Sequence, residues 1–105
     1  MMDSQSYKII ISERARQMLE DHVRFLLTVD KEAASKKKER IISAIRSLDT
    51  MPQRFPFFNA MYIVPNKYHK MVIDRVYIAL YQIKEDRVYV DYILDCRKDY
   101  QWILR

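Results

Sequence analysis

The last third of the chain contains three short apolar runs whose side chains alternate as in β-strands. The runs are Tyr68–Ile73, Val76–Lys84 and Arg87–Asp95, and charged pairs separate them at residues 74–75 and 85–86. They are rich in Val, Ile and Tyr, which fit a pleated, half-buried surface. A helix would instead repeat its apolar residues every three or four positions. The pattern therefore predicts an antiparallel meander of three strands.

The two faces of each run predict where its strand lies in the sheet. Apolar and polar side chains alternate along the third run, which predicts a strand with one buried face. The face expected to be buried carries Val88, Val90, Tyr92 and Leu94. Asp91 and Asp95 share the other face, which we expect to be exposed to solvent. The middle run is apolar on both faces, so we expect it to be the central strand.

The chain ahead of the meander predicts one strand and two helices. Tyr7–Ile11 is a short apolar run that joins the sheet, either parallel or antiparallel to its neighbour. Ser12 and Asp30 stand where helix N-caps are expected. The segments after them carry apolar stripes of helical spacing, and the second stripe continues to about Leu48. Two prolines within residues 49–56 end the second helix.

This order of elements predicts the α+β class, in one domain that spans residues 1–105. The expected architecture is an N-terminal strand, an antiparallel helix hairpin on one face of the sheet, the three-stranded antiparallel meander and a short C-terminal tail. We expect Phe57 and Phe58 to close one end of the core, and His22 to be a boundary residue. The chain has no glycine, so its turns are expected to use Asn, Asp, Pro or type I geometry, and glycine-rich phosphate loops are excluded.

Charge and cysteine content indicate the setting in which the chain works. Nineteen Lys and Arg against 14 Asp and Glu give a net charge of +5, which is compatible with a polyanion, an acidic protein partner or neither. The single cysteine cannot form an internal disulfide, which favours a reducing compartment. No apolar run approaches the ~20 residues of a membrane span, and the N-terminus does not resemble a signal peptide. We therefore expect a cytoplasmic protein without a membrane partner.

Cationic and aromatic residues near the sheet are the candidates for a functional site. Paired His or Cys ligands are absent from the sequence, so we expect no metal and no cofactor. Cations stabilise the negative charge of a phosphoryl-transfer transition state, and aromatic rings stack on bases. The candidates are His69, Lys70, Arg75, Arg97, Lys98, Tyr100 and Trp102. The basic run at residues 36–40 is either a solvated helix face or a phosphate-contacting stripe.

Four segments of the chain carry a resemblance to a known family. They are YKIIISERARQMLEDHVRFL, IISAIRSLDTMPQRFP, RVYIALYQIKEDRVYVDYIL and DCRKDY. In their strand–helix–helix–meander order they resemble the RelE/ParE superfamily of bacterial type II toxin–antitoxin toxins, from Tyr7 to Arg105. The resemblance implies a small toxin that is neutralised by an antitoxin, whose acidic or amphipathic C-terminal segment wraps the sheet and helices. RelE-like members cut mRNA on the ribosome without a metal, whereas ParE-like members poison DNA gyrase.

One strand departs from the pattern of the ribonuclease branch. An arginine usually follows the first tyrosine of its YxxxY motif, and Ile78 occupies that place here, between Tyr77 and Tyr81. Two lysines typical of the preceding strand are reduced to Lys70, with Val72 at the second position. An apolar side chain cannot stabilise the negative charge of the transition state. The resemblance therefore favours the ParE-like branch.

Three hypotheses about function follow from the resemblance. The favoured one is an inhibitory protein that binds gyrase through Lys36, Lys37, Arg97, Lys98 and Trp102. The alternative is a ribosome-dependent mRNA endoribonuclease, with the catalytic set Lys70, Arg75, Arg97, Lys98 and Tyr100, and with His69 as a further acid–base candidate. The third is a non-toxic basic interaction module. The expected partners are a cognate antitoxin and either gyrase or the ribosome with mRNA, with the chain a monomer or part of a toxin–antitoxin hetero-oligomer.

Overall fold

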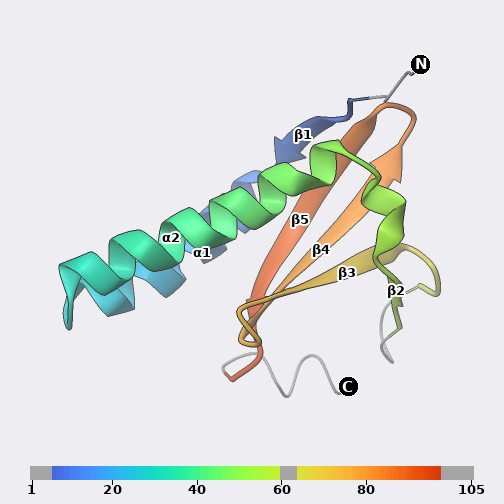
Figure 1. Cartoon of the computed structure of the whole chain (residues 1–105). Helices are drawn as coiled ribbons and strands as arrows, with labels where there is room; N and C mark the ends of the chain where they lie inside the picture. The colour runs from blue at the N-terminus through green and yellow to red at the C-terminus, as the bar shows by residue number, and fades with distance from the viewer. Residues whose placement is uncertain (1–5, 60–63, 98–105) are drawn as a thin grey trace.

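The computed structural model describes residues 6–59 and 64–97, and it has two helices packed on a five-stranded sheet of order β1-β5-β4-β3-β2 (Figure 1). The helices are α1 (Glu13–Leu27) and α2 (Lys31–Arg46), followed by the short 3-10 helices η1 (Ser47–Asp49) and η2 (Pro52–Arg54). The strands are β1 (Lys8–Ile11), β2 (Phe57–Phe58), β3 (Tyr68–Ile73), β4 (Tyr77–Lys84) and β5 (Arg87–Asp95). The predicted α+β class is confirmed, and so is the central position of β4.

The structure shows how the N-terminal strand β1 is oriented relative to its neighbour, which the sequence left open. β1 runs parallel to β5, with Ile9 opposite Val88 and Ile11 opposite Val90. The meander β3-β4-β5 is antiparallel, as predicted. A parallel pairing requires the chain to return to the same end of the sheet between the two strands. The helix hairpin provides the first part of that return.

The prediction that both phenylalanines close one end of the core is wrong for Phe57. Phe57 and Phe58 form the edge strand β2, which pairs antiparallel with the first two residues of β3. Phe57 is 44% exposed, whereas Phe58 is 5% exposed and belongs to an apolar cluster on the sheet face away from the helices. The two side chains point to opposite faces because they are neighbours in a strand.

Both helices begin at the predicted caps. The Ser12 side chain accepts a hydrogen bond from the Ala15 amide at 3.0 Å. The Asp30 carboxylate accepts from the amides of Glu32 and Ala33 at 3.0 and 3.2 Å. These side chains satisfy amides that have no partner within the helix.

The main core lies between the helix hairpin and one face of the sheet. Its buried residues include Ala15, Leu19, Val23, Ala34, Ile41, Ile45, Met71, Tyr77, Ala79, Tyr81, Val88, Val90 and Ile93. The hairpin is longer than this contact, and its α1–α2 turn extends past the sheet (Figure 1). Phe25, Leu27 and Val29 are exposed near that turn.

A β-bulge at Asp91 reverses the side-chain alternation of β5. Leu80 of β4 pairs with Tyr92, but Tyr81 pairs with Val90, so Asp91 is an extra residue in β5. A bulge of this kind moves every later side chain of its strand to the other face.

The bulge makes the predicted buried face of β5 partly wrong. Val88 and Val90 face the helices as expected, but beyond the bulge it is Ile93 that joins the main core. Tyr92 and Leu94 lie on the opposite face, where Leu94 belongs to the second cluster. The expectation that Asp95 is exposed is also wrong, because only 1% of this residue is accessible.

The glycine-free turns use more residue types than predicted. Positive φ angles occur at Met51, Asn66, Asp74, Arg75 and Glu85. The prediction that Asn, Asp, Pro or type I geometry would suffice is therefore wrong for the Met, Arg and Glu positions. Between β3 and β4, two consecutive residues, Asp74 and Arg75, have φ angles of 52° and 61°. This backbone matches the right-handed twist of the strands that it joins.

Candidate functional site

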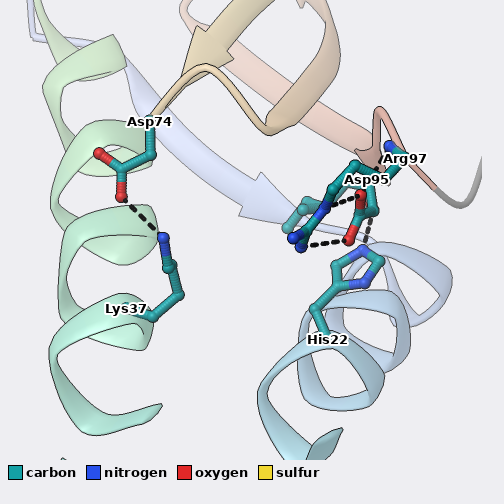
Figure 2. Close-up of polar contacts among 6 residues, drawn as sticks. His22, Lys37, Asp74, Asp95 and Arg97 are labelled. Carbon is teal, nitrogen blue, oxygen red and sulfur yellow. Dashed lines mark hydrogen bonds and ion pairs between the residues drawn. The ribbon is translucent and has the colours of Figure 1, made fainter. Parts of the chain in front are cut away.

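Polar side chains from both helices meet the end of the sheet at the β3–β4 turn. We call this group the turn-end cluster; Figure 2 labels five of its members. It consists of His22 of α1, Lys37 of α2, Asp74 of the turn, Tyr77 of β4, and Asp95 and Arg97 at the end of β5. The cluster contains two residues that the sequence proposed as target contacts, Lys37 and Arg97.

Asp74 connects the turn to α2. Its Oδ2 atom lies 3.3 Å from Lys37 Nζ and 3.4 Å from Arg40 NH1. The Lys37 and Asp74 side chains are only 23% and 28% exposed, so solvent screens this pair less than a pair on the open surface. The interaction fixes the turn against the second helix.

Tyr77 links the two halves of the cluster. Lys37 Nζ lies 5.6 Å from the centre of its ring, and the centre of the His22 ring lies 5.2 Å from it. Burial of the ring raises the pKa of Tyr77, and the nearby Asp95 carboxylate raises it further. The phenol is therefore held in its neutral form.

Arg97 and Asp95 form the second ion pair of the cluster. Arg97 NH2 lies 3.2 Å from Asp95 Oδ2, and its Nε donates to Oδ1 at 3.3 Å. The backbone amide of Arg97 also donates to Oδ1 at 2.8 Å. Hydrogen bonding to this carboxylate, and then its charge, raises the pKa of Arg97. Arg97 is thus largely exposed, but its charge is paired.

His22 is buried, so the prediction of a boundary position is wrong. The residue is 7% exposed, and its Nε2 lies 2.8 Å from the carbonyl oxygen of Ile93. Since a carbonyl only accepts, Nε2 carries the proton. Nδ1 is buried and has no hydrogen-bond partner among the described residues. This histidine fastens α1 to β5.

The remaining candidates that the structure describes do not join the cluster. Lys70 lies on the sheet face away from the helices, with Nζ 6.0 Å from the ring of Phe58. Lys36 is exposed on α2 and pairs with Glu32 at 3.5 Å. Arg75 is exposed in the turn beside Asp74. The candidates that lie outside the described residues are Lys98, Tyr100 and Trp102.

His69 packs between aromatic rings and bonds to the backbone ahead of β2. Its Nδ1 lies 2.7 Å from the carbonyl oxygen of Phe55. Its ring lies between those of Phe57 and Tyr81, with centroids 4.3 and 5.3 Å away. The residue therefore holds the segment before β2 against the sheet.

An open groove runs between α2 and the end of β3. It has a volume of about 580 Å³, and its lining includes Lys36, Arg40, Val72 and Asp74. Val72, one of the lining residues, is 52% exposed. The groove combines exposed cations with the exposed apolar side chain of Val72.

Among the residues that the structure describes, none pairs with the edge of β3 beside this groove. β2 covers only Tyr68 and His69, and the Lys70 amide donates to the Pro56 carbonyl at 2.8 Å. Alternate residues direct their amides to the same edge, so the Val72 amide also points away from β4. Across residues 6–59 and 64–97, no backbone carbonyl outside the sheet accepts a hydrogen bond from the Val72 amide.

Comparison with known proteins identifies the family of the chain. A family model for the ParE toxin of the type II toxin–antitoxin system parDE matches residues 9–100. The chain belongs to this ParE toxin family. A solved chromosomal ParDE TA system from P. aeruginosa is similar in structure, with a TM-score of 0.73 at 16% identity over 88% of this chain and 98% of that chain. A search of curated proteins finds no match.

Membership in the ParE family confirms the resemblance to the RelE/ParE superfamily. Ile78, at the position where the ribonucleases have arginine, is 7% exposed and packs in the second apolar cluster. In the part of the chain that the structure describes, no helix is both long and apolar enough to cross a membrane. Within the same residues, His, Cys, Asp and Glu side chains form no group of three that could hold a metal ion.

Four cluster residues were not among the functional candidates from sequence. They are His22, Asp74, Tyr77 and Asp95. A short carboxylate side chain two residues before a basic residue, as in Asp95 and Arg97, is a local signal for the observed hydrogen bond to the backbone amide. No comparable local signal places Asp74 beside Lys37, since 37 residues separate them.

Proposed function

We propose that this ParE family toxin inhibits growth by poisoning DNA gyrase, and that a cognate antitoxin keeps it silent. The observation that carries the proposal is the buried Ile78 in place of the ribonuclease arginine. Loss of one charge-stabilising group from such a site lowers the rate by about 100-fold or more. A toxin that acts by binding has no need of that group.

The positions of the other catalytic candidates support the same choice. Lys70 lies on the sheet face away from the helices, whereas Arg97 contacts Asp95 in the turn-end cluster. A ribonuclease needs several cations around one phosphate. Among the described candidates, Lys70 and Arg97 lie on opposite faces of the sheet, and the charge of Arg97 is partly neutralised.

The α2 surface beside the turn-end cluster is the target-binding surface that we propose. Lys36 and Arg40 have side chains that are 63% and 60% exposed, and Lys37 lies between them and the sheet. Arg97 extends the same positive surface with a side chain that is 71% exposed. These charges favour association with an acidic surface of a gyrase–DNA complex.

The groove beside β3 is the surface that we propose for the antitoxin. An extended segment can pair with the free edge at Val72, while acidic side chains approach Lys36 and Arg40. The similar solved structure from P. aeruginosa is that of a ParDE TA system, which supports a partner of this class. Val72→Asp would place a charge at the apolar centre of this contact.

Two reactions with purified protein test the proposed target. With gyrase and supercoiled plasmid, we expect cleaved DNA to accumulate in covalent complexes with the enzyme. With translating ribosomes, we expect mRNA to stay intact. Site-specific mRNA cleavage without gyrase trapping would replace the proposal with the endoribonuclease. Absence of both activities would favour a non-toxic interaction module.

A matched pair of variants tests the antitoxin surface. Val72→Asp should weaken the toxin–antitoxin complex by about tenfold or more, as measured by calorimetric titration. Val29→Asp at the helix-hairpin turn is the control, because Val29 is 73% exposed and lies outside the groove. Equal affinity of the two variants would remove the groove from the proposal.

A further inference from the structure

The sheet face away from the helices presents two tyrosine rings side by side because of the bulge in β5. Tyr89 pairs with Gln82, and Tyr92 pairs with Leu80, two residues before Gln82 in β4. If Asp91 were an ordinary strand residue instead of a bulge, Tyr92 would share the face of Val90 in the main core. Both rings are half-buried, so each retains exposed surface. Bulges commonly re-aim a side chain at functional sites.

A cation lies near each of these rings. The Arg14 guanidinium is 4.5 Å from the centre of the Tyr92 ring, and its NH1 donates to the Tyr92 hydroxyl. Lys84 Nζ is 5.9 Å from the Tyr89 ring. The exposed Arg14 and Lys84 side chains thus place positive charge beside aromatic surface on an open sheet.

A third tyrosine, Tyr68, packs against Tyr92. The Tyr68 ring meets the Tyr92 ring edge-on, with centroids 5.8 Å apart and planes at 82°. Its hydroxyl donates to Asp91 Oδ2 at 2.9 Å, and Gln82 Nε2 donates to the same oxygen at 2.9 Å. These contacts hold the bulge and fix the orientation of Tyr92. Lys67 lies 5.4 Å from the Tyr68 ring and adds a further cation at this edge.

We propose that this tyrosine face, formed by Arg14, Lys67, Tyr68, Lys84, Tyr89 and Tyr92, binds single-stranded nucleic acid. Exposed aromatic rings stack on unpaired bases, and interleaved Lys and Arg side chains neutralise the phosphates between them. Tyr89 and Tyr92 oppose β4 residues two positions apart, which corresponds to about 7 Å along a strand. Stacked bases in a duplex are only about 3.4 Å apart. The two rings therefore suit bases that are separated from each other, as in a single strand.

The chemistry of the face distinguishes this ligand from an acidic protein segment. An acidic peptide needs the cations but gains little from exposed tyrosine rings, whereas a nucleic acid uses both. The carboxylate of Asp91 would repel phosphates, so the ligand must place bases, which carry N–H donors, near the bulge. The inference deepens the proposed function, and its role in gyrase poisoning rests on that function. A gyrase poison that binds an unpaired DNA strand contacts the substrate as well as the enzyme.

Fluorescence anisotropy of the full chain with a labelled oligothymidylate of about 12 nucleotides tests the inference at ~50 mM salt. We expect saturable binding that is at least about fivefold tighter than binding to a duplex of the same length. Tyr92→Leu should weaken binding by about tenfold, whereas Tyr92→Phe, which keeps the ring, should retain it. Circular dichroism and urea unfolding establish that each variant is folded.

Two exposed arginines of α1 provide a control that is matched in charge. Arg14→Ala should weaken binding, while Arg24→Ala, which removes the same charge far from the face, should not. No binding, equal binding to the duplex, equal effects of the two arginine variants, or unchanged binding by Tyr92→Leu would each overturn the inference. Displacement of the oligonucleotide by polyglutamate at equal charge would assign the face to an acidic protein instead.

Gyrase trapping by the same variants separates this inference from the proposed function. Trapping by a toxin that does not bind the oligonucleotide would overturn the tyrosine-face inference and leave gyrase as the target. Oligonucleotide binding without trapping would overturn the gyrase target and leave the face as a nucleic-acid site. When both activities occur, loss of trapping in Tyr92→Leu but not in Tyr92→Phe is the expected result.

Discussion

The guanidinium of Arg97 lies against the buried carboxylate of Asp95. Two of its nitrogens lie 3.2 and 3.3 Å from the two carboxylate oxygens, and the Arg97 amide donates to one of them at 2.8 Å. The Asp95 side chain is 2% exposed, whereas that of Arg97 is 71% exposed. A carboxylate with so little access to water depends on its donors. Arg97 therefore has a structural role at the end of β5 in addition to any contact with a target.

Arg97→Ala is expected to destabilise the fold. The substitution leaves Asp95 in its buried position with the Arg97 backbone amide but without the cation, which should cost about 1–3 kcal/mol. Urea unfolding of the purified variant measures this loss. Asp95→Asn in the same chain removes the buried charge and should restore a large part of the stability. If Arg97→Ala unfolds at the same urea concentration as the wild type, the ion pair contributes nothing to the stability of the fold.

The coupling between Arg97 and Asp95 also determines how toxicity data should be interpreted. Loss of growth arrest in Arg97→Ala alone could reflect unfolding rather than a lost target contact. The double variant with Asp95→Asn separates the two, because it lacks the same cation but has no buried charge. Growth arrest that returns in the double variant would exclude a direct role of Arg97 at the target.

Alkaline pH is expected to unfold the protein through two buried tyrosines. Burial, followed by the hydrogen bond to Asp91, raises the pKa of Tyr68 to about 12, and burial raises the pKa of Tyr81 to about 12. Because the folded pKa exceeds the ordinary value of about 10, the contribution to stability is complete below pH 10. It is lost as the pH rises through 12. Each tyrosine lowers the stability by up to about 1.4 kcal/mol per pH unit in this window.

Urea unfolding between neutral pH and pH 12 tests the alkaline transition. The wild-type midpoint should be constant up to about pH 9 and then fall steeply. In the Tyr68→Phe, Tyr81→Phe double variant this fall should be much shallower, even though its stability at neutral pH is lower. An equal slope for both proteins would show that these phenols do not cause the transition.

Strand and helix positions could be predicted because their signals are local. The three runs of the meander differ from the observed strands by at most one residue at either end. The caps Ser12 and Asp30 were predicted because their side chains bond to amides two or three residues away. In both cases the sequence neighbourhood contains all the groups that determine the structure.

The candidate site could be predicted only in part, because it depends on pairings between distant residues. The bulge at Asp91 interrupts the pairing of β5 with β4. The alternation of apolar and polar residues continues through this position, so the sequence does not indicate a bulge there. The bulge in turn buries Asp95, and this explains why Arg97 is paired rather than free. Lys37 was expected as a target contact, but its proximity to Asp74 arises from the packing of α2 on the sheet.

Ser12→Ala is expected to cost more than removal of an ordinary helix cap. Ser12 accepts from the Ala15 amide at 3.0 Å and also donates to the backbone carbonyl of Asp91 at 3.2 Å. We expect a loss of about 1.5–2 kcal/mol, against about 1 kcal/mol for Asp30→Ala, whose side chain only caps its helix. Urea unfolding compares the two variants. An equal loss in both would mean that the contact with the bulge adds no stability.

Arg75→Gly is expected to stabilise the fold without loss of toxicity. Arg75 has a φ angle of 61° in the β3–β4 turn, next to Asp74 at 52°. Such angles cost a side-chain-bearing residue about 1–2 kcal/mol, and glycine avoids this strain but loses more entropy on folding. The net gain should be about 0.5–1 kcal/mol. Asp74 is kept, because its carboxylate pairs with Lys37 and Arg40.

Arg75→Ala is the control, because it removes the same cation without relieving the backbone. We expect no gain in urea unfolding for this variant, and growth arrest on expression of either protein. The ribonuclease hypothesis makes the opposite prediction for toxicity, since it counts Arg75 among the catalytic cations. Growth arrest that disappears in both variants, with their stability intact, would therefore return Arg75 to a catalytic role and weaken the assignment of gyrase as the target.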